Sequence, residues 1–242
     1  MVVLASTTST QDSGLLDPLT ERFEKENPDF RVKVVAVGSG EAMELGRRGD
    51  ADVLLVHSPD DEEKFMKEGR GASRRPVMRN DFVIAGPPRD PAGVARRSDA
   101  VEVFRLISSA RWPFISRGDD SGTHKRERKT WDRAEVRPAG RWYIESGQGM
   151  AETLTLASEL EAYVLTDTAT LKVMAKGLRL STLSAGDPLL VNPYSVIPVR
   201  GSTRRGALAF ADWITGPRGQ DFIESFGASK FGDPLFTPTA AE

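Results

Sequence analysis

Residues 2–10 read Val-Val-Leu-Ala-Ser-Thr-Thr-Ser-Thr. The first four residues form a short apolar run, which predicts a buried strand. The next five are all Ser or Thr, and residues 12–26 then place Leu15, Leu19 and Phe23 on one helical face. Residues 2–26 therefore predict a buried strand, a hydroxyl-rich turn and an amphipathic helix, in that order.

The same order of strand, turn and helix recurs along most of the chain. Short apolar runs predict further strands at residues 32–37, 53–56, 82–85, 113–116, 142–145 and 162–166. Amphipathic segments lie between most of these runs. Because strands that alternate with helices pair mostly in parallel, we expect an α/β protein with mixed, mostly parallel sheets flanked by helices.

Two extended stretches interrupted by proline, near residues 84–88 and 192–198, are the expected crossings between domains. The expected lobe I combines residues 1–84 with 198–242, and the expected lobe II spans 88–192. Two crossing strands would form a hinge. Because ligands usually bind in a cleft between lobes, a ligand cleft is expected there.

The composition is that of a globular protein with nearly balanced charge. The chain has 242 residues, 39% of them hydrophobic, and 33 Lys and Arg against 35 Asp and Glu. The net charge of −2 argues against a nucleic-acid binder, and no apolar run reaches the ~18 residues of a transmembrane helix. With no cysteine, and His57 and His124 as the two histidines, disulfides and thiolate or polyhistidine metal sites are not expected.

Five small, hydroxyl-rich or glycine-rich turns each follow a predicted strand and begin a helix. They lie at residues 6–10, 38–40, 57–59, 120–123 and 146–149. A helix N-terminus exposes backbone N–H groups and the positive end of its dipole, and Ser and Thr add further donors. Several such turns together would form an anion site with few formal charges.

Each turn also has a simpler interpretation, because Ser, Thr, Asp and Gly are the favoured helix N-caps. Residues 57–59 fit that interpretation. Residues 6–10 and 120–123 favour ligand contact, and five successive hydroxyls at 6–10 exceed what one cap needs. For Ser39 both interpretations stay open.

Arg117 precedes the run Asp119-Asp120-Ser121-Gly122-Thr123-His124. Its planar, permanently charged guanidinium suits a tetrahedral oxyanion. The alternative is an ion pair with Asp119 or Asp120, which would be the preferred interpretation of Arg117 by itself.

Common enzyme motifs are absent from the sequence, including the phosphate-binding loop, the nucleophile elbow and the His-Glu-x-x-His metal motif. Ser121 and His124 are poorly spaced for a nucleophile and base. Asp119, Asp120 and His124 could hold a metal ion, but a capped helix start is favoured. A basic helical face is expected to be solvated; it comprises Lys125, Arg126, Arg128, Lys129 and Arg133.

In these motifs the sequence resembles the tungstate-binding proteins of ABC-type tungstate importers. The resemblance runs through nearly the whole chain, and the motifs are specific in combination. They lie at residues 6–9, 11–15, 37–42, 49–59, 80–87, 116–124, 147–150 and 192–197.

The resemblance implies a two-lobed type II periplasmic binding protein that captures an oxyanion and delivers it to the permease subunits of an ABC importer. It implies tungstate or molybdate as the ligand, no cofactor, no catalysis and no metal cation. It places the protein in the periplasm or on the outer face of the cytoplasmic membrane, as an expected monomer whose export signal is not in this chain. The implied oxyanion contacts are Thr8, Ser9, Ser39, Arg117, Ser121, Gly122 and Thr123.

Other functions stay open at this point. The anion could be molybdate, sulfate or phosphate in place of tungstate. A cytoplasmic effector-sensing domain is disfavoured, because no DNA-binding helix-turn-helix accompanies it. An enzyme acting on a small anionic substrate is disfavoured by the lack of an evident nucleophile or metal set.

Overall fold

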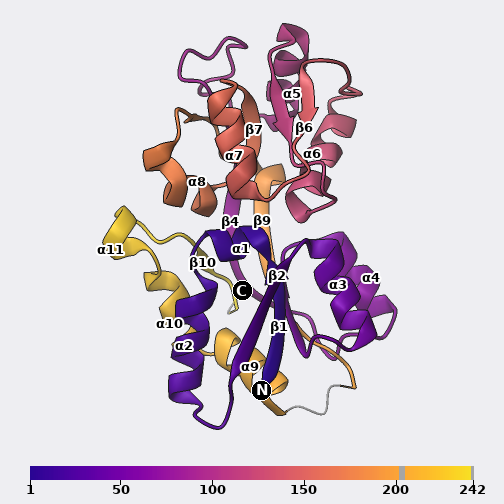
Figure 1. Ribbon diagram of the computed structural model, residues 1–242, viewed down its shortest axis with the longest axis vertical. Coiled ribbons are helices and arrows are strands. Elements are labelled where there is room, and N and C mark those ends of the chain that lie inside the picture. The colour runs from indigo at the N-terminus through magenta and orange to yellow at the C-terminus, as the bar shows by residue number, and fades with distance from the viewer. Residues whose placement is uncertain (202–204, 241–242) are drawn as a thin grey trace. The chain divides into compact units, whose positions relative to one another are not determined.

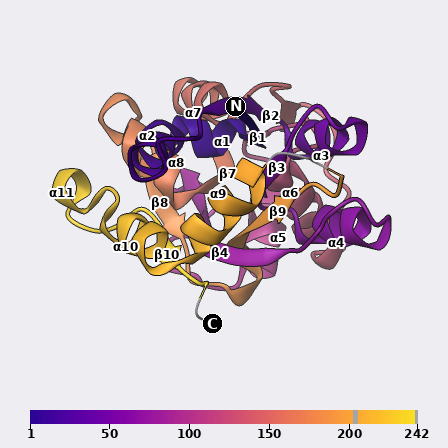
Figure 2. The same cartoon turned by 90° about the horizontal axis from the view of Figure 1, so that it is seen from below.

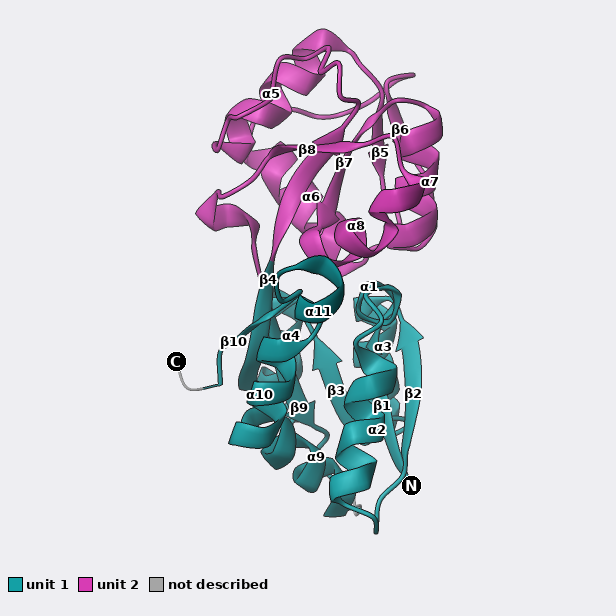
Figure 3. Cartoon of the chain, turned by 90° about the vertical axis from the view of Figure 1, so that its left-hand side faces the viewer, with its two compact units in different colours: residues 1–80, 193–242 teal, residues 81–192 magenta. Residues whose placement is uncertain are grey.

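The computed structural model describes residues 1–201 and 205–240, and it divides into two compact units (Figure 3). Unit 1 comprises residues 1–80 and 193–242, and unit 2 comprises residues 81–192. The chain passes from one unit to the other within strands β4 (Arg75–Gly86) and β9 (Val191–Pro198). The lobes and the hinge expected from the proline-interrupted stretches stay a prediction.

The sheet of unit 1 has parallel strands at its centre. β1 (Val2–Thr7) lies between β2 (Val32–Val37) and β3 (Val53–Val56) and is parallel to both. β9 is antiparallel to β3, and the short β10 (Thr237–Pro238) is antiparallel to β4. Because the three parallel strands run the same way, the turns that follow them lie at one edge of the sheet.

Helices cover both faces of this sheet (Figures 1 and 2). One face packs against α3 and α4 through a core that includes Ala5, Met43, Leu54 and Phe65. On the other face, Phe23 of α2 packs edge-on against Phe210 of α9, with ring centroids 5.2 Å apart. The unit 1 helices are α1 (Thr8–Asp12), α2 (Leu16–Glu26), α3 (Ser39–Arg48), α4 (Pro59–Lys67), α9 (Arg205–Thr215), α10 (Pro217–Ser225) and α11 (Ala228–Phe231).

The sheet of unit 2 has the strand order β4-β7-β5-β6, with β8 also paired to β4. β5 is parallel to β6 and β7, and β4 is antiparallel to β7. Phe82 and Ile84 of β4 face the core beneath α5 and α6, whereas Val83 and Ala85 face the core beneath α7 and α8. The remaining elements are α5 (Ala100–Ala110), β5 (Phe114–Ser116), α6 (Gly122–Arg133), β6 (Tyr143–Glu145), α7 (Met150–Glu159), β7 (Tyr163–Asp167), α8 (Thr168–Met174) and β8 (Ser181–Ser184).

The α/β prediction is confirmed, and the strands predicted from apolar runs are present. β4 is longer than the predicted strand at 82–85, because its first half pairs with β10, where Thr237 lies opposite Arg79. The helix predicted at 12–26 is interrupted at Gly14, which has a positive φ of 76°. No helix in the described part of the chain combines the length and apolar character that a bilayer crossing requires.

Candidate functional site

The predicted anion contacts fall into two groups, each at the edge of a sheet where parallel strands end. The unit 1 cluster consists of Thr7, Thr8, Ser9, Ser39 and His57. The unit 2 cluster consists of Arg117, Asp119, Ser121, Gly122 and Thr123. In α/β folds ligands bind outside the carboxyl ends of the strands, which is where both clusters lie.

Thr7 is the centre of the unit 1 cluster. It is the N-cap of α1, and its hydroxyl lies 3.2 Å from that of Ser9 and 2.7 Å from that of Thr10. His57 Nε2 lies 3.1 Å from Thr7 Oγ1 and 3.4 Å from Ser9 Oγ. The His57 ring also stacks on Tyr194, with centroids 4.6 Å apart. These contacts join the ends of β1 and β3.

Ser39 belongs to the same edge because its strand is paired with β1. Thr7 lies opposite Val37 in the β1–β2 register, so the turns that follow these two residues are adjacent. Ser39 is the buried first residue of α3, and Thr8 is the half-buried first residue of α1.

The structure assigns internal roles to some of the hydroxyls at residues 6–10. Ser6 Oγ donates to the Leu55 carbonyl at 2.8 Å, and Thr7 caps α1. His57, interpreted from sequence as a helix start, is a buried partner of two of these hydroxyls. Its position directly after β3 was the available signal, but only the folded sheet brings it to Thr7.

In unit 2, Ser121 is the N-cap of α6. Its hydroxyl accepts from the His124 backbone N–H at 3.3 Å, which leaves its own O–H able to donate elsewhere. Gly122 and Thr123 are the first two residues of the 12-residue helix, where backbone N–H groups point away from the helix. This arrangement provides an anion with donors and with the positive end of a helix dipole.

The Thr123 hydroxyl is the most informative atom of this cluster. The residue is 1% exposed, and within the described ranges its Oγ1 has no hydrogen-bond partner. Buried polar groups are almost always hydrogen-bonded, and an unpaired one costs about 1–3 kcal/mol. An oxyanion at the α6 N-terminus would satisfy this hydroxyl.

Arg117 is 2% exposed and lies directly after β5. Asp119 Oδ2 accepts from both Nε, at 3.1 Å, and Nη2. Of the two ion pairs weighed from sequence, the one with Asp119 is therefore present, whereas Asp120 pairs with Lys125 at 3.4 Å. The pair is formed by a buried guanidinium, so Arg117 is not an ordinary surface charge.

The turn at residues 146–149 adjoins the unit 2 cluster. The Ser146 and Gly147 backbone N–H groups donate to the carbonyls of Ser116 and Arg117, both at 2.9 Å. Gly118 has a φ of 63°, and a Cβ there would lie 2.7 Å from the Glu145 Cβ. Glycine is therefore required at residue 118, and the loop that carries Arg117 is held closely against β6.

A buried carboxyl group lies one helical turn beyond Thr123. Glu127 Oε1 accepts from Tyr143 Oη at 2.8 Å and from Trp131 Nε1 at 3.0 Å. Burial raises the pKa of Glu127 to about 7, although hydrogen bonds from Ser116, Tyr143 and Trp131 oppose this rise. Sequence reasoning missed this residue, because α6 reads as a polar helix.

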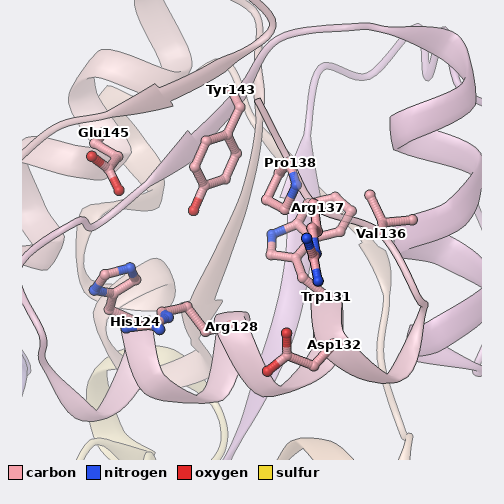
Figure 4. A pocket seen from close by; sticks show the side chains of 9 residues that line it. All are labelled: His124, Arg128, Trp131, Asp132, Val136, Arg137, Pro138, Tyr143 and Glu145. Atoms are coloured by element: carbon pink, nitrogen blue, oxygen red, sulfur yellow. The ribbon is translucent and has the colours of Figure 1, made fainter. Parts of the chain in front are cut away.

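Figure 4 shows a cavity of about 260 Å³ beside α6, lined in part by His124, Tyr143 and Glu145. Burial lowers the pKa of His124, and its Nδ1 accepts from the Asp120 backbone N–H at 3.0 Å. With Ser121 Oγ accepting from the His124 amide, these are the contacts of a capped helix start. Among the described residues, no group of three potential metal ligands occurs.

The basic face predicted on α6 is only partly solvated. Arg128, Lys129 and Arg133 are exposed, whereas Arg126 donates to the carbonyls of Leu189 and Val191 at 2.6 and 3.3 Å. Arg126 therefore connects α6 to the first residue of β9 and to the turn that precedes it.

Known proteins are similar to this chain in both sequence and fold. The model of a family described as PBP superfamily domain matches residues 2–218. The tungstate-binding protein TupA of Peptoclostridium acidaminophilum is 44% identical over all of this chain and 86% of its own length.

Two solved structures are also similar. The tungstate ABC transporter structure from Geobacter sulfurreducens has 43% identity and a TM-score of 0.84, covering 93% of this chain and 98% of its own. The tungstate-binding protein TupA from Desulfovibrio alaskensis G20 has 37% identity and a TM-score of 0.82, covering 99% and 98%. The periplasmic-binding-protein fold implied by the sequence motifs is confirmed. The chain belongs to the PBP superfamily, in the family of tungstate-binding proteins to which these relatives belong.

Proposed function

We propose that this protein captures tungstate outside the cytoplasmic membrane and delivers it to the permease subunits of an ABC importer. The names of the relatives, at 37–44% identity over nearly the whole chain, support the ligand class and the transport role. The protein acts as a monomeric carrier in the periplasm or at the outer face of the cytoplasmic membrane. Binding is reversible, with no covalent step and no cofactor.

The buried Thr123 hydroxyl, which has no hydrogen-bond partner among the residues that the structure describes, is the observation that carries the anion assignment. It lies at the N-terminus of a 12-residue helix, two residues after the Ser121 cap. A tetrahedral dianion at this point would accept from Thr123 Oγ1, from Ser121 Oγ and from the first backbone N–H groups of α6. Arg117 supplies the formal positive charge.

Unit 1 has hydroxyl donors of its own. Thr8, Ser9 and Ser39 in unit 1 are the hydroxyl donors implied by the family resemblance. The supporting observation is that Ser9 and Ser39 are buried at one edge of the sheet, next to the turn that begins at Thr8.

The chemistry of the unit 2 cluster favours a fully deprotonated oxyanion. Tungstate, molybdate and sulfate only accept hydrogen bonds at neutral pH, whereas hydrogen phosphate also needs an acceptor for its proton. Asp119 is the carboxylate of this cluster, and both its oxygens already accept, Oδ2 from Arg117 and Oδ1 from the Ser121 N–H at 3.2 Å. Because Asp119 already holds Arg117 and the helix start, we expect phosphate to be the least favoured of the four anions.

Isothermal titration of the purified chain with tungstate, molybdate, sulfate and phosphate tests this function at one ionic strength and pH. We expect tungstate to bind most tightly and phosphate most weakly. A panel of phosphate esters, assayed for both binding and turnover, tests the alternative of an enzyme. Turnover of an ester, or binding of phosphate in preference to tungstate, would contradict the proposal.

A further inference from the structure

The Arg117–Asp119 pair differs from the surface ion pairs of this chain in its burial. The Arg117 side chain is 3% exposed and that of Asp119 is 19% exposed. Nε and Nη2 donate to the same carboxylate oxygen, so the pair fixes the plane of the guanidinium. An Arg side chain without such a contact samples many rotamers, and this contact restricts Arg117 before any ligand arrives.

Asp119 is also tied to the helix start. Its second oxygen accepts from the Ser121 backbone N–H at 3.2 Å, so one carboxylate connects Arg117 with the N-cap of α6. The position of the guanidinium is therefore set relative to Ser121 and Thr123, because the same side chain holds both ends. Gly118 lies between these two residues and packs against Glu145 too closely to leave room for a Cβ, so β6 holds the intervening backbone in place.

We propose that Asp119 is a positioning and specificity residue, which holds Arg117 at a fixed place relative to the α6 N-terminus. This inference rests on the proposed oxyanion function. Asp119 does not contact the anion, and it acts through Arg117. A guanidinium held at a fixed place matches one size of tetrahedral anion. Without Asp119, the Arg117 side chain could move to contact a smaller anion such as sulfate.

The consequence for binding follows from preorganisation. Donors that are already in position lose little entropy when the ligand binds, so the fixed arrangement increases affinity for the anion that fits. Releasing Arg117 should weaken tungstate binding more than sulfate binding. The ratio of the two dissociation constants is therefore the quantity that reports the role of Asp119.

A double-mutant cycle on binding tests this role. The four proteins are the wild type, Asp119→Asn, Arg117→Ala and the double variant, titrated with sodium tungstate and sodium sulfate at one ionic strength. We expect Asp119→Asn to weaken tungstate binding at least tenfold and to reduce the preference for tungstate over sulfate. In the Arg117→Ala background the same substitution should change tungstate affinity less than twofold.

Two further variants control this experiment. Asp132→Asn makes the same charge change at an exposed residue nearer the end of α6 and should keep both affinities within twofold of the wild type. Asp119→Glu keeps the charge but displaces it, and it should weaken tungstate binding as Asp119→Asn does. It also keeps the inference testable if Asp119→Asn does not fold.

Equal losses from Asp119→Asn in both backgrounds would overturn the inference, because Asp119 would then act through α6 rather than through Arg117. An unchanged ratio of tungstate to sulfate affinity would also overturn it. Both results leave the proposed function intact, provided that the wild type binds tungstate. A wild type that binds none of the oxyanions would overturn the proposed function and this inference together.

Discussion

At the scale of single residues, unit 2 contains a polar atom that the folded chain does not satisfy. Thr123 Oγ1 is buried, and within residues 1–201 and 205–240 it has no hydrogen-bond partner. Such an atom destabilises the ligand-free protein, and it contributes a favourable hydrogen bond only when an acceptor binds. The hydroxyl of Thr123 therefore lowers the stability of the ligand-free protein but increases its affinity for an anion.

Thr123→Val should separate these two demands. Valine keeps the shape of threonine and removes the hydroxyl. We expect tungstate affinity to fall by roughly ten- to a hundredfold, since a hydrogen bond to a charged group contributes about 1.5–3 kcal/mol. The ligand-free Tm should stay level or rise. Titration calorimetry and thermal unfolding measure the two quantities.

Thr155→Val is the matched control for this variant. Thr155 is exposed on α7, and its hydroxyl donates to the Ala151 carbonyl at 3.0 Å. Its replacement should leave tungstate affinity unchanged. A drop in ligand-free stability for Thr123→Val, with unchanged affinity, would contradict the proposed contact.

At the scale of elements, the N-terminus of α6 has two functions, because Ser121 both caps the helix and donates to the proposed anion. Ser121→Ala removes the oxygen that accepts from the His124 N–H. We expect a loss of about 1 kcal/mol in unfolding free energy, which is typical of a lost N-cap, together with weaker tungstate binding. Ser121→Gly should restore most of the stability, because Gly is a tolerated N-cap, but not the affinity.

The same helix carries the buried acid Glu127. Its folded-state pKa of about 7 lies above the ordinary value of 4.5, so its contribution to stability is fully present below pH 4.5 and is lost as the pH rises through 7. At ~1.4 kcal/mol per pKa unit, the loss is of the order of 3 kcal/mol.

Glu127→Gln should remove this dependence. Glutamine cannot ionise, and its carbonyl can still accept from Trp131 and Tyr143. We expect the variant to match the wild type near pH 4.5 and to be more stable at pH 8, as measured by urea unfolding across this range. A difference that does not change with pH would show that Glu127 titrates normally in the folded state.

At the scale of the whole molecule, reversible capture predicts a coupling between ligand concentration and stability. A ligand that binds only the folded state at a hundred times its Kd stabilises it by about 2.7 kcal/mol. Tungstate should therefore raise the Tm in a concentration-dependent way, and dialysis should return the Tm to its starting value.

Arg117→Ala is the test variant for this effect. It should show a much smaller shift at the same tungstate concentrations, because the cluster then lacks its buried cation. A shift that survives exhaustive dialysis, or that sulfate and phosphate produce equally, would contradict selective and reversible capture.

Much of the architecture could be predicted from local patterns. The valine-rich runs of β1, β2 and β3 are apolar enough to predict strands by themselves, and β1 and β3 are largely buried. The cap of α6 was readable from Ser121, because a small hydroxyl residue before a helix has a local function. The first half of β4 could not be predicted, because its partner β10 lies more than 150 residues away in the chain. Residues 75–80 read Arg-Pro-Val-Met-Arg-Asn, in which the apolar run is only two residues long.

The sequence by itself determined the alternation of strands and helices and the hydroxyl-rich turns where anion donors could gather, because these depend on neighbours along the chain. Tertiary structure alone decided that Ser6 donates to the Leu55 carbonyl, that His57 contacts Thr7 and that Glu127 is buried. It also decided that the Thr123 hydroxyl has no partner within the described part of the chain. The physical reason is that a polar atom's partners are set by what packs around it. Those groups come from strands and helices that only the folded sheet brings together.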